Sequence, residues 1–221
     1  MKFRSVFDII GPIMLGPSSS HTAGAARIGL LARRLFIDEP TAVKVHFYGS
    51  FAQTYEGHAT DIAVVGGLLN MDVADPKLPE ALKIARQKGI DIEFIREDAI
   101  PVHPNTVRLE LFNGSDSLSV TGISIGGGAV QITDYSGFPL NLSGEHPTLL
   151  ILHKDAYGTI AAVAQCLVQE HINIAHMEVS RLTKGEKALM VLELDEMPND
   201  DTIACIKRQN NVQKVVILNA D

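Results

Sequence analysis

TLLILH at residues 148–153 begins the stretch of sequence that decides the fold. This apolar run has the length of a β-strand. After the turn at Gly158, apolar residues recur every three or four positions, as on the buried face of a helix. Four further segments have strand, strand, helix and strand patterns in that order: residues 172–181, 188–194, 198–206 and 212–218. The order β-α-β-β-α-β predicts the split βαβ unit of a ferredoxin-like fold.

A change of composition at residues 135–147 marks the boundary between two domains. The segment reads YSGFPLNLSGEHP, in which Gly, Pro, Ser and Asn interrupt the apolar periodicity. We therefore predict an N-terminal domain at 1–136, a linker at 137–147 and a C-terminal domain at 148–221. Upstream of the boundary, helix patterns alternate with strand patterns: 22–36, 58–69 and 79–88 as helices, and 43–47, 91–95, 106–112, 117–125 and 129–135 as strands. The predicted fold class is α+β, and the strand order of the N-terminal domain does not follow from the pattern.

Composition and charge exclude several classes of protein. The chain has 221 residues, of which 46% are hydrophobic, so it can bury a core. Its formal net charge of −7 repels phosphate backbones, so nucleic acid is not an expected partner. No apolar run approaches the roughly 20 residues of a membrane span, and the N-terminus lacks the pure apolar segment of a secretory signal. We expect a cytoplasmic protein without a membrane partner.

Cys166 and Cys205 are the only thiols, and each lies in a stretch with helical periodicity. We predict two buried, reduced cysteines rather than a disulfide or a metal pair. Two cysteines are also too few for an iron–sulfur cluster, which usually takes about four. No metal ligands are therefore assigned to this chain.

The segment Gly16–Gly24, GPSSSHTAG, places three serines, a histidine and a threonine just before a helix. Hydroxyls and free backbone N–H groups at a helix N-terminus favour a carboxylate or another anion. An elaborate N-cap, with Ser20 or Thr22 as the capping residue, explains the same letters equally well. A Ser–His nucleophile pair is the weaker alternative, because adjacent residues rarely present their side chains to each other.

Three other clusters could carry chemistry. His58 follows Gly57 at a predicted helix start, where it could titrate near neutrality, although a lone histidine is more often structural. His103-Pro104-Asn105 is a rigid turn whose two polar side chains could grip a ligand, or a plain loop. Gly126-Gly127-Gly128 permits the close approach of a ligand or another backbone, but lacks the spacing of a nucleotide-binding loop.

These segments together resemble a known family. SVFDIIGPIMLGPSSSHTAGAARIG at residues 5–29, GHATD at 57–61, HPNT at 103–106 and SIGGGAV at 124–130 are similar, in the same order, to the beta chain of two-subunit, iron–sulfur-dependent L-serine dehydratases. Ala25 replaces a proline of the single-chain relatives, and residues 53–56 lack one of their glycines. The N-terminal domain resembles the allosteric-substrate-binding fold, and the C-terminal domain is similar to an ACT domain.

The resemblance implies an enzyme of serine catabolism that feeds gluconeogenesis, an L-serine ammonia-lyase that eliminates water from L-serine to give pyruvate and ammonia. It implies His58 as the Cα base, or a group assisting it, and His21 as the second candidate. The implied substrate-binding residues are Ser18, Ser19, Ser20, Thr22, Gly24, His103, Asn105, Gly126 and Gly127. The 4Fe–4S cluster would belong to an alpha subunit, without which this chain would be inactive.

For the C-terminal domain, the resemblance implies pairing of ACT domains edge to edge. It also implies a regulatory ligand near the loop after the first strand, at Asp155, Tyr157 and Gly158, with Asn173 nearby. Two other functions stay open from the residues: a non-catalytic ACT-type amino-acid sensor, and a serine hydrolase, which the missing G-x-S-x-G elbow disfavours. The sequence does not separate L-serine from L-threonine as the substrate, because a methyl group is worth only about 1–3 kcal/mol of discrimination.

Overall fold

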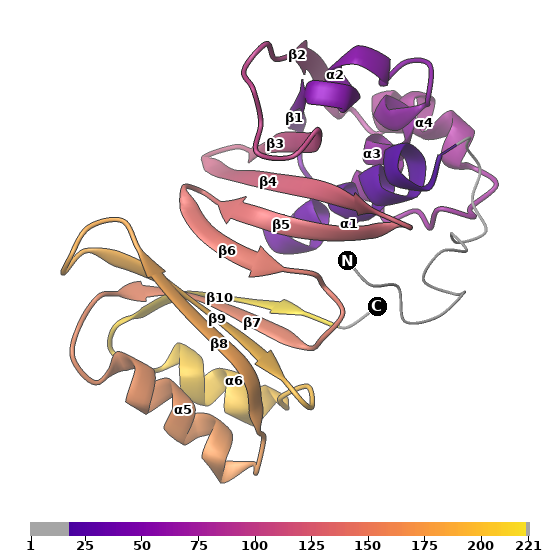
Figure 1. The fold of residues 1–221 in the computed structure, drawn as a ribbon. Coiled ribbons are helices and arrows are strands. Elements are labelled where there is room, and N and C mark those ends of the chain that lie inside the picture. Colours follow the sequence, from indigo (N-terminus) through magenta and orange to yellow (C-terminus); the bar gives the residue numbers. More distant parts are fainter. Residues whose placement is uncertain (1–17, 220–221) are drawn as a thin grey trace. The chain divides into compact units, whose positions relative to one another are not determined.

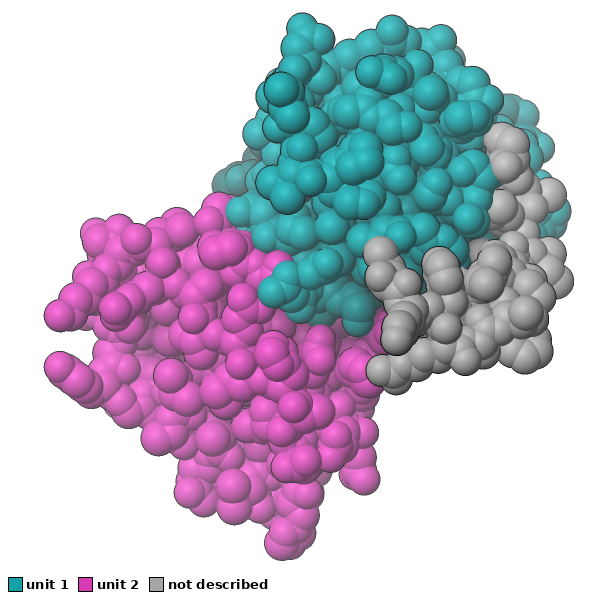
Figure 2. All heavy atoms as spheres, viewed as in Figure 1, with its two compact units in different colours: residues 1–136, 141–143 teal, residues 137–140, 144–221 magenta. Residues whose placement is uncertain are grey.

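A computed structural model describes residues 18–219 of the chain, drawn as a ribbon in Figure 1. The described residues divide into two compact units, coloured separately in Figure 2. Unit 1 is the described part of residues 1–136 together with 141–143, and unit 2 is residues 137–140 together with the described part of 144–221. No helix within residues 18–219 is both long enough and apolar enough to cross a membrane. The α+β class predicted from the sequence is confirmed.

A six-stranded mixed sheet with the order β2-β1-β3-β4-β5-β6 organises the first part of the chain. Its strands are β1 (Ala42–Tyr48), β2 (Asp91–Arg96), β3 (Asn105–Asn113), β4 (Asp116–Gly126), β5 (Ala129–Tyr135) and β6 (Phe138–Leu142). The β1–β2 pair is parallel, and the β1–β3, β3–β4 and β4–β5 pairs are antiparallel. Alternate residues such as Val45, Phe47, Val107 and Leu109 are fully buried, because strand side chains point to opposite faces in turn.

Strand β6 lies inside the segment predicted as a linker. Phe138, Leu140 and Leu142 are buried while Pro139 and Asn141 between them are exposed, which is the period of a half-buried strand. The glycine and proline in this stretch resemble loop signals and conceal the alternation.

Helices α1 (Gly24–Phe36) and α3 (Thr60–Leu68) pack against each other in unit 1, and α1 also packs on β4 and β5 (Figure 1). The two helix backbones touch, because a Cβ atom built on Gly67 would lie 1.9 Å from the Ala26 carbonyl oxygen. The remaining helical elements are η2 (Ser19–Ala23), α2 (Gly49–Thr54), η3 (Leu78–Glu80) and α4 (Ala81–Gln87). Of these, η2 is a π-helical turn that runs directly into α1.

Unit 2 has the element order predicted from the sequence. Its strands β7 (Thr148–Lys154), β8 (Ile174–Arg181), β9 (Lys187–Leu194) and β10 (Val212–Leu218) form an antiparallel sheet with the order β10-β7-β9-β8. Helices α5 (Thr159–Gln169) and α6 (Asp200–Lys207) lie on one face of this sheet (Figure 1). Asn199 caps α6 by accepting a hydrogen bond from the Thr202 N–H at 2.8 Å. The β-α-β-β-α-β prediction is confirmed.

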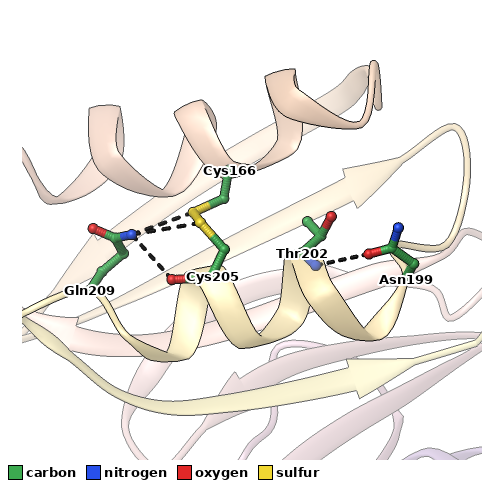
Figure 3. The surroundings of a disulfide bond; sticks show 5 residues. All are labelled: Cys166, Asn199, Thr202, Cys205 and Gln209. Carbon is green, nitrogen blue, oxygen red and sulfur yellow. Dashed lines mark hydrogen bonds between the residues drawn. A yellow bond between two sulfur atoms is a disulfide. The ribbon is translucent and has the colours of Figure 1, made fainter.

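The prediction of two reduced thiols is wrong. Cys166 of α5 and Cys205 of α6 form a disulfide with a Cα–Cα distance of 5.9 Å, and the Gln209 amide donates to both sulfur atoms (Figure 3). The two helices pack side by side on one sheet face, and each places a cysteine at the contact. A sequence separation of 39 residues gives no sign of this proximity.

Candidate functional site

His21 and His58 meet in unit 1, although they are 37 positions apart in the sequence. Their ring centroids lie 4.8 Å apart in an edge-to-face arrangement. His21 projects from the π-helical turn η2, and His58 lies just before α3. Thr22 joins the two segments by donating its hydroxyl to the His58 carbonyl oxygen at 3.3 Å. The structure therefore brings together the two histidines that the sequence singles out.

Serine hydroxyls contact both nitrogens of the His21 ring. The Nδ1 atom lies 3.1 Å from Ser20 Oγ and 3.4 Å from Ser18 Oγ, and the Nε2 atom lies 3.0 Å from Ser50 Oγ. The rings of His21 and Phe51 also contact each other, with centroids 5.2 Å apart. The ring is thus fixed between hydroxyls on two sides and an aromatic edge.

The segment before α1 is both a helix cap and a cluster of hydroxyls. Ser18 caps η2, because its Oγ accepts the His21 N–H at 3.2 Å, so the capping residue is neither Ser20 nor Thr22. The Ser19 carbonyl accepts the Gly24 N–H, which links the π turn to α1. π-Helical turns recur at functional sites, and here the turn directs the Ser20 and His21 side chains toward each other.

Burial shapes the electrostatics of the site. It lowers the pKa of His21 below its ordinary value of 6.5, and the neighbouring His58 lowers that pKa further. Burial also raises the pKa of Asp61, in the first turn of α3, above its ordinary 3.8. A lowered pKa keeps the His21 ring neutral near pH 7, in the form that accepts a proton.

The start of α3 carries buried polar atoms that no described residue satisfies. They are His58 Nδ1, Thr60 Oγ1 and Asp61 Oδ1. Ala59, between them, adopts the left-handed conformation with φ 54°, which a non-glycine residue rarely takes. An unpaired buried polar group costs about 1–3 kcal/mol, so such a group in a native structure calls for an explanation. Three such atoms, one of them on His58 itself, make this segment a candidate site.

The turn containing His103 and Asn105 is tied to the same site. The Ser50 N–H donates to the Pro104 carbonyl at 2.7 Å, and Asn105 forms a bridge with Gly49. Within the turn, His103 Nδ1 accepts the Asn105 N–H at 3.2 Å. The His103 ring thus hydrogen-bonds within the turn itself, and the turn is anchored to Ser50, whose hydroxyl contacts His21.

Gly126 ends β4 and Gly127 begins the β4–β5 turn, and the two have positive φ values of 103° and 62°. The β3–β4 register places this turn at the same sheet end as Asn105, whose amide donates to the Ser124 carbonyl at 3.5 Å. Gly24 fits the site for a packing reason, because a Cβ built on it would lie 2.1 Å from Ser124 Oγ. Ser50 and Ser124 are residues that sequence reasoning missed. Ser124 is the first residue of the quoted SIGGG segment, whereas Ser50 follows a strand end without a motif.

A cavity of 470 Å³ borders the site. It is lined by Gly49, Ala52, Gln53 and residues 96–101. Gly49 connects it to Ser50, but none of the residues predicted from the sequence lines it. Ile100 on its rim is 98% exposed, and Val102, two residues later, is exposed in the same loop.

The four residues predicted to bind a regulatory ligand in unit 2 do not converge. Asp155 accepts bonds from the Gly185 N–H at 2.9 Å and from Arg181 at 3.0 Å, and both contacts lower its pKa. Tyr157 is fully exposed, and Gly158 caps α5 with φ 82°. Asn173 pairs with Asp195 at the other end of the sheet, because the crossover through α5 returns the chain to the end where β7 begins. The expectation that Asn173 lies near the Asp155 loop is therefore wrong.

Among residues 18–219, no group of histidine, cysteine, aspartate and glutamate side chains could hold a metal ion. Both cysteines of the chain are bonded to each other in unit 2. This donor set does not fit an iron–sulfur cluster.

Comparison with known proteins gives a consistent result. Residues 5–90 match the family model of the serine dehydratase beta chain. The probable L-serine dehydratase beta chain of Bacillus subtilis is 54% identical over 215 residues, which cover 97% of this chain and 98% of that relative. The L-serine dehydratase beta chain of Peptoniphilus asaccharolyticus is 34% identical over 199 residues, 89% of each chain. L-serine dehydratase 1 of Escherichia coli is 31% identical over 158 residues, which are 60% of this chain and 34% of that longer relative.

Proposed function

The chain belongs to the family of L-serine dehydratase beta chains, and we propose that it supplies half of the active site of an L-serine ammonia-lyase. The reaction removes the Cα proton and the β-hydroxyl of L-serine as water. The resulting aminoacrylate tautomerises and is hydrolysed to pyruvate and ammonia. The observation that carries the proposal is the contact between His21 and His58 beside the serine-rich segment that leads into α1.

The substrate carboxylate is proposed to bind at the segment that leads into α1. Ser18, Ser19, Ser20 and Thr22 concentrate hydroxyls there, and the helix dipole adds positive potential. Asn105 and the Gly126–Gly127 turn border the same end of the sheet. Together they would hold an amino acid with its Cα hydrogen toward the histidines.

His58 is proposed as the base that takes the Cα proton, with His21 as the second candidate. The Nδ1 atom of His58 is buried and has no partner among the described residues, so it is free to bond to a substrate atom. His21 uses both ring nitrogens in contacts with serines. A general base needs a nitrogen within hydrogen-bond reach of the proton, and this difference favours His58.

The 4Fe–4S cluster is proposed to reside in an alpha subunit, since the donor set of this chain does not fit one. When bound, such a cluster would supply a Lewis acid for the departing hydroxyl. The Escherichia coli relative supports a divided site, because the region similar to this chain is only 34% of its length. The chain alone is therefore proposed to be inactive.

Unit 2 is proposed to be an ACT-type regulatory domain that associates with a second copy. Strand β8 lies at the edge of its sheet, and Met177 and Val179 on this strand are partly exposed. An open edge of this kind pairs readily with another chain. The loop with Asp155, Tyr157 and Gly158 remains the proposed ligand site, whereas Asn173 of the same copy lies at the other sheet end.

Anaerobic co-expression with a cysteine-rich alpha chain tests the proposed function. The purified complex should carry a brown chromophore and release pyruvate from L-serine, while each chain alone should release none. L-threonine, tested in parallel, defines the substrate preference. If the chain binds amino acids but supports no pyruvate release with any alpha chain, it is an amino-acid sensor and not an enzyme subunit.

A further inference from the structure

We infer that Ser50 is a positioning residue, which holds the His21 ring against His58 during dehydration. The inference rests on the proposed function and adds to it a residue outside the Ser-His, GHATD, HPN and GGG segments. Its basis is the 3.0 Å contact between Ser50 Oγ and His21 Nε2, across 29 positions of sequence.

Ser50 is itself held firmly by the backbone around it. Its N–H donates to the Pro104 carbonyl at 2.7 Å, and its carbonyl accepts the Thr54 hydroxyl at 2.8 Å. Gly49 before it has φ 53°, and a Cβ there would lie 2.6 Å from the Pro104 oxygen, so this close approach requires glycine. The Ser50 hydroxyl is therefore presented from a fixed frame rather than from a mobile loop.

Ser50 completes the enclosure of the His21 ring by hydroxyls. On the opposite edge, Ser20 and Ser18 face Nδ1, and their own Oγ atoms lie 3.3 Å apart. A hydroxyl can donate or accept a hydrogen bond. Either neutral tautomer of His21 can therefore bond at both nitrogens without rotating, and the ring keeps its place beside His58 whichever nitrogen carries the proton.

Without the Ser50 hydroxyl, no hydrogen bond from a described residue holds the Nε2 edge of the His21 ring. Its remaining contacts are Ser18 and Ser20 at Nδ1 and the rings of Phe51 and His58. His58 is the titratable group against it among the described residues, and both burial and His58 lower the pKa of His21. A ring that swings toward solvent escapes both influences, so its pKa rises toward 6.5.

The test compares Ser50→Ala, Ser50→Thr and Gln53→Ala in the assembled alpha–beta enzyme. Ser50→Thr keeps the hydroxyl, and Gln53→Ala shortens an exposed side chain of the same helix α2. We expect Ser50→Ala to lower kcat about 10- to 100-fold, part of the 10²–10⁴-fold that acid–base groups contribute, with KM changed less than about 3-fold. The acidic limb of its kcat–pH profile should move to higher pH, while Ser50→Thr restores most of kcat and Gln53→Ala keeps the wild-type profile.

Two results would overturn the inference. The first is a Ser50→Ala enzyme with kcat within about 2-fold of wild type and an unmoved pH profile. The second is an equal loss in all three variants, which would assign Ser50 a role in folding only. Pyruvate release by the wild-type complex is measured first. If it is absent, the proposed function fails and the inference with it; if it is present, the variants decide on Ser50 alone.

Discussion

His58 in unit 1 and His153 in unit 2 show how differently the two parts of the chain use the same side chain. Each has one buried ring nitrogen without a partner among the described residues. His153 projects from the regular strand β7, and its Nδ1 contacts the adjacent Lys154 carbonyl at 2.8 Å. His58 lies where regular structure is interrupted, next to left-handed Ala59 and in edge contact with His21. We propose that local irregularity together with contact to a second histidine ring distinguishes a reactive histidine from a packed one.

The largest expected effect is on catalysis, and it tests this comparison directly. His58→Ala in the alpha–beta complex should lower kcat by about 10²–10⁴-fold, because removing a general base forfeits that contribution. The matched variant His153→Ala should lower the thermal stability of the protein but leave kcat within a few-fold. Steady-state pyruvate assays and melting curves measure both quantities. A His58→Ala enzyme with nearly normal kcat would show that His58 is not the base. A His153→Ala enzyme that is folded but inactive would show that His153 is not merely a packing residue.

The two units also differ in how far the sequence predicts them. The element order of unit 2 follows from its pattern, because β7 and β9 are nearly continuous apolar runs and α5 repeats apolar residues every three to four positions, whereas the strand order of unit 1 does not follow from its pattern. Segments such as 148–153 and 188–194 therefore appear with correct type and order. Strand β6 was not predicted, because Gly137 and Pro139 are typical of a loop. Buried Phe138, Leu140 and Leu142 nevertheless alternate with exposed residues, as in a strand.

The periodicity of the sequence does not indicate which side chains lie close together in the fold. The sequence singles out His21 and His58 because each stands in an unusual local setting, and the fold brings them into contact. Ser50 has no such setting, since a glycine and a serine after a strand are typical of many helix starts. Cys166 and Cys205 likewise meet only through the packing of α5 against α6. Contacts between segments depend on tertiary structure, which the local pattern does not specify.

The next largest effect concerns the disulfide of unit 2. The double variant Cys166→Ala/Cys205→Ala should lower the free energy of unfolding of oxidised unit 2 by about 2–4 kcal/mol, because the cross-link no longer restricts the unfolded chain. Hydrogen exchange resolved by peptide should show faster exchange in α5 and α6 and unchanged exchange in α1 and α3. Catalysis should persist in the assembled complex.

The control for this variant is the wild-type chain with and without a thiol reductant. Disulfides are uncommon in reducing compartments, so the reduced form is the relevant reference there. Reduction should bring the exchange of α5 and α6 close to that of the double variant. If the reductant leaves wild-type exchange unchanged, the two sulfur atoms are not bonded in the oxidised sample.

The smallest expected effect is a difference in how the two units respond to acid. In unit 1 the pKa of His21 lies below 6.5, so near and below that pH the unfolded state binds more protons than the folded state. The stability of unit 1 should therefore fall as the pH drops through about 6.5. In unit 2, the Gly185 N–H and Arg181 lower the pKa of Asp155 below 3.8. The contribution of Asp155 is present above that value and is lost only as the pH falls further, through its folded pKa.

Asp61 gives unit 1 a second, opposite response in the pH range just above 3.8. Burial raises its pKa above 3.8, so the folded state takes up a proton earlier than the unfolded state, and unit 1 recovers stability there. Hydrogen exchange between about pH 7 and pH 5, corrected for intrinsic rates, should show α1 and α3 losing protection while α5 and α6 keep theirs. His21→Gln should remove the loss in unit 1, because the titrating ring is gone. Equal losses in both units, or a loss in unit 1 that persists in His21→Gln, would show that the acid response does not come from the histidine pair.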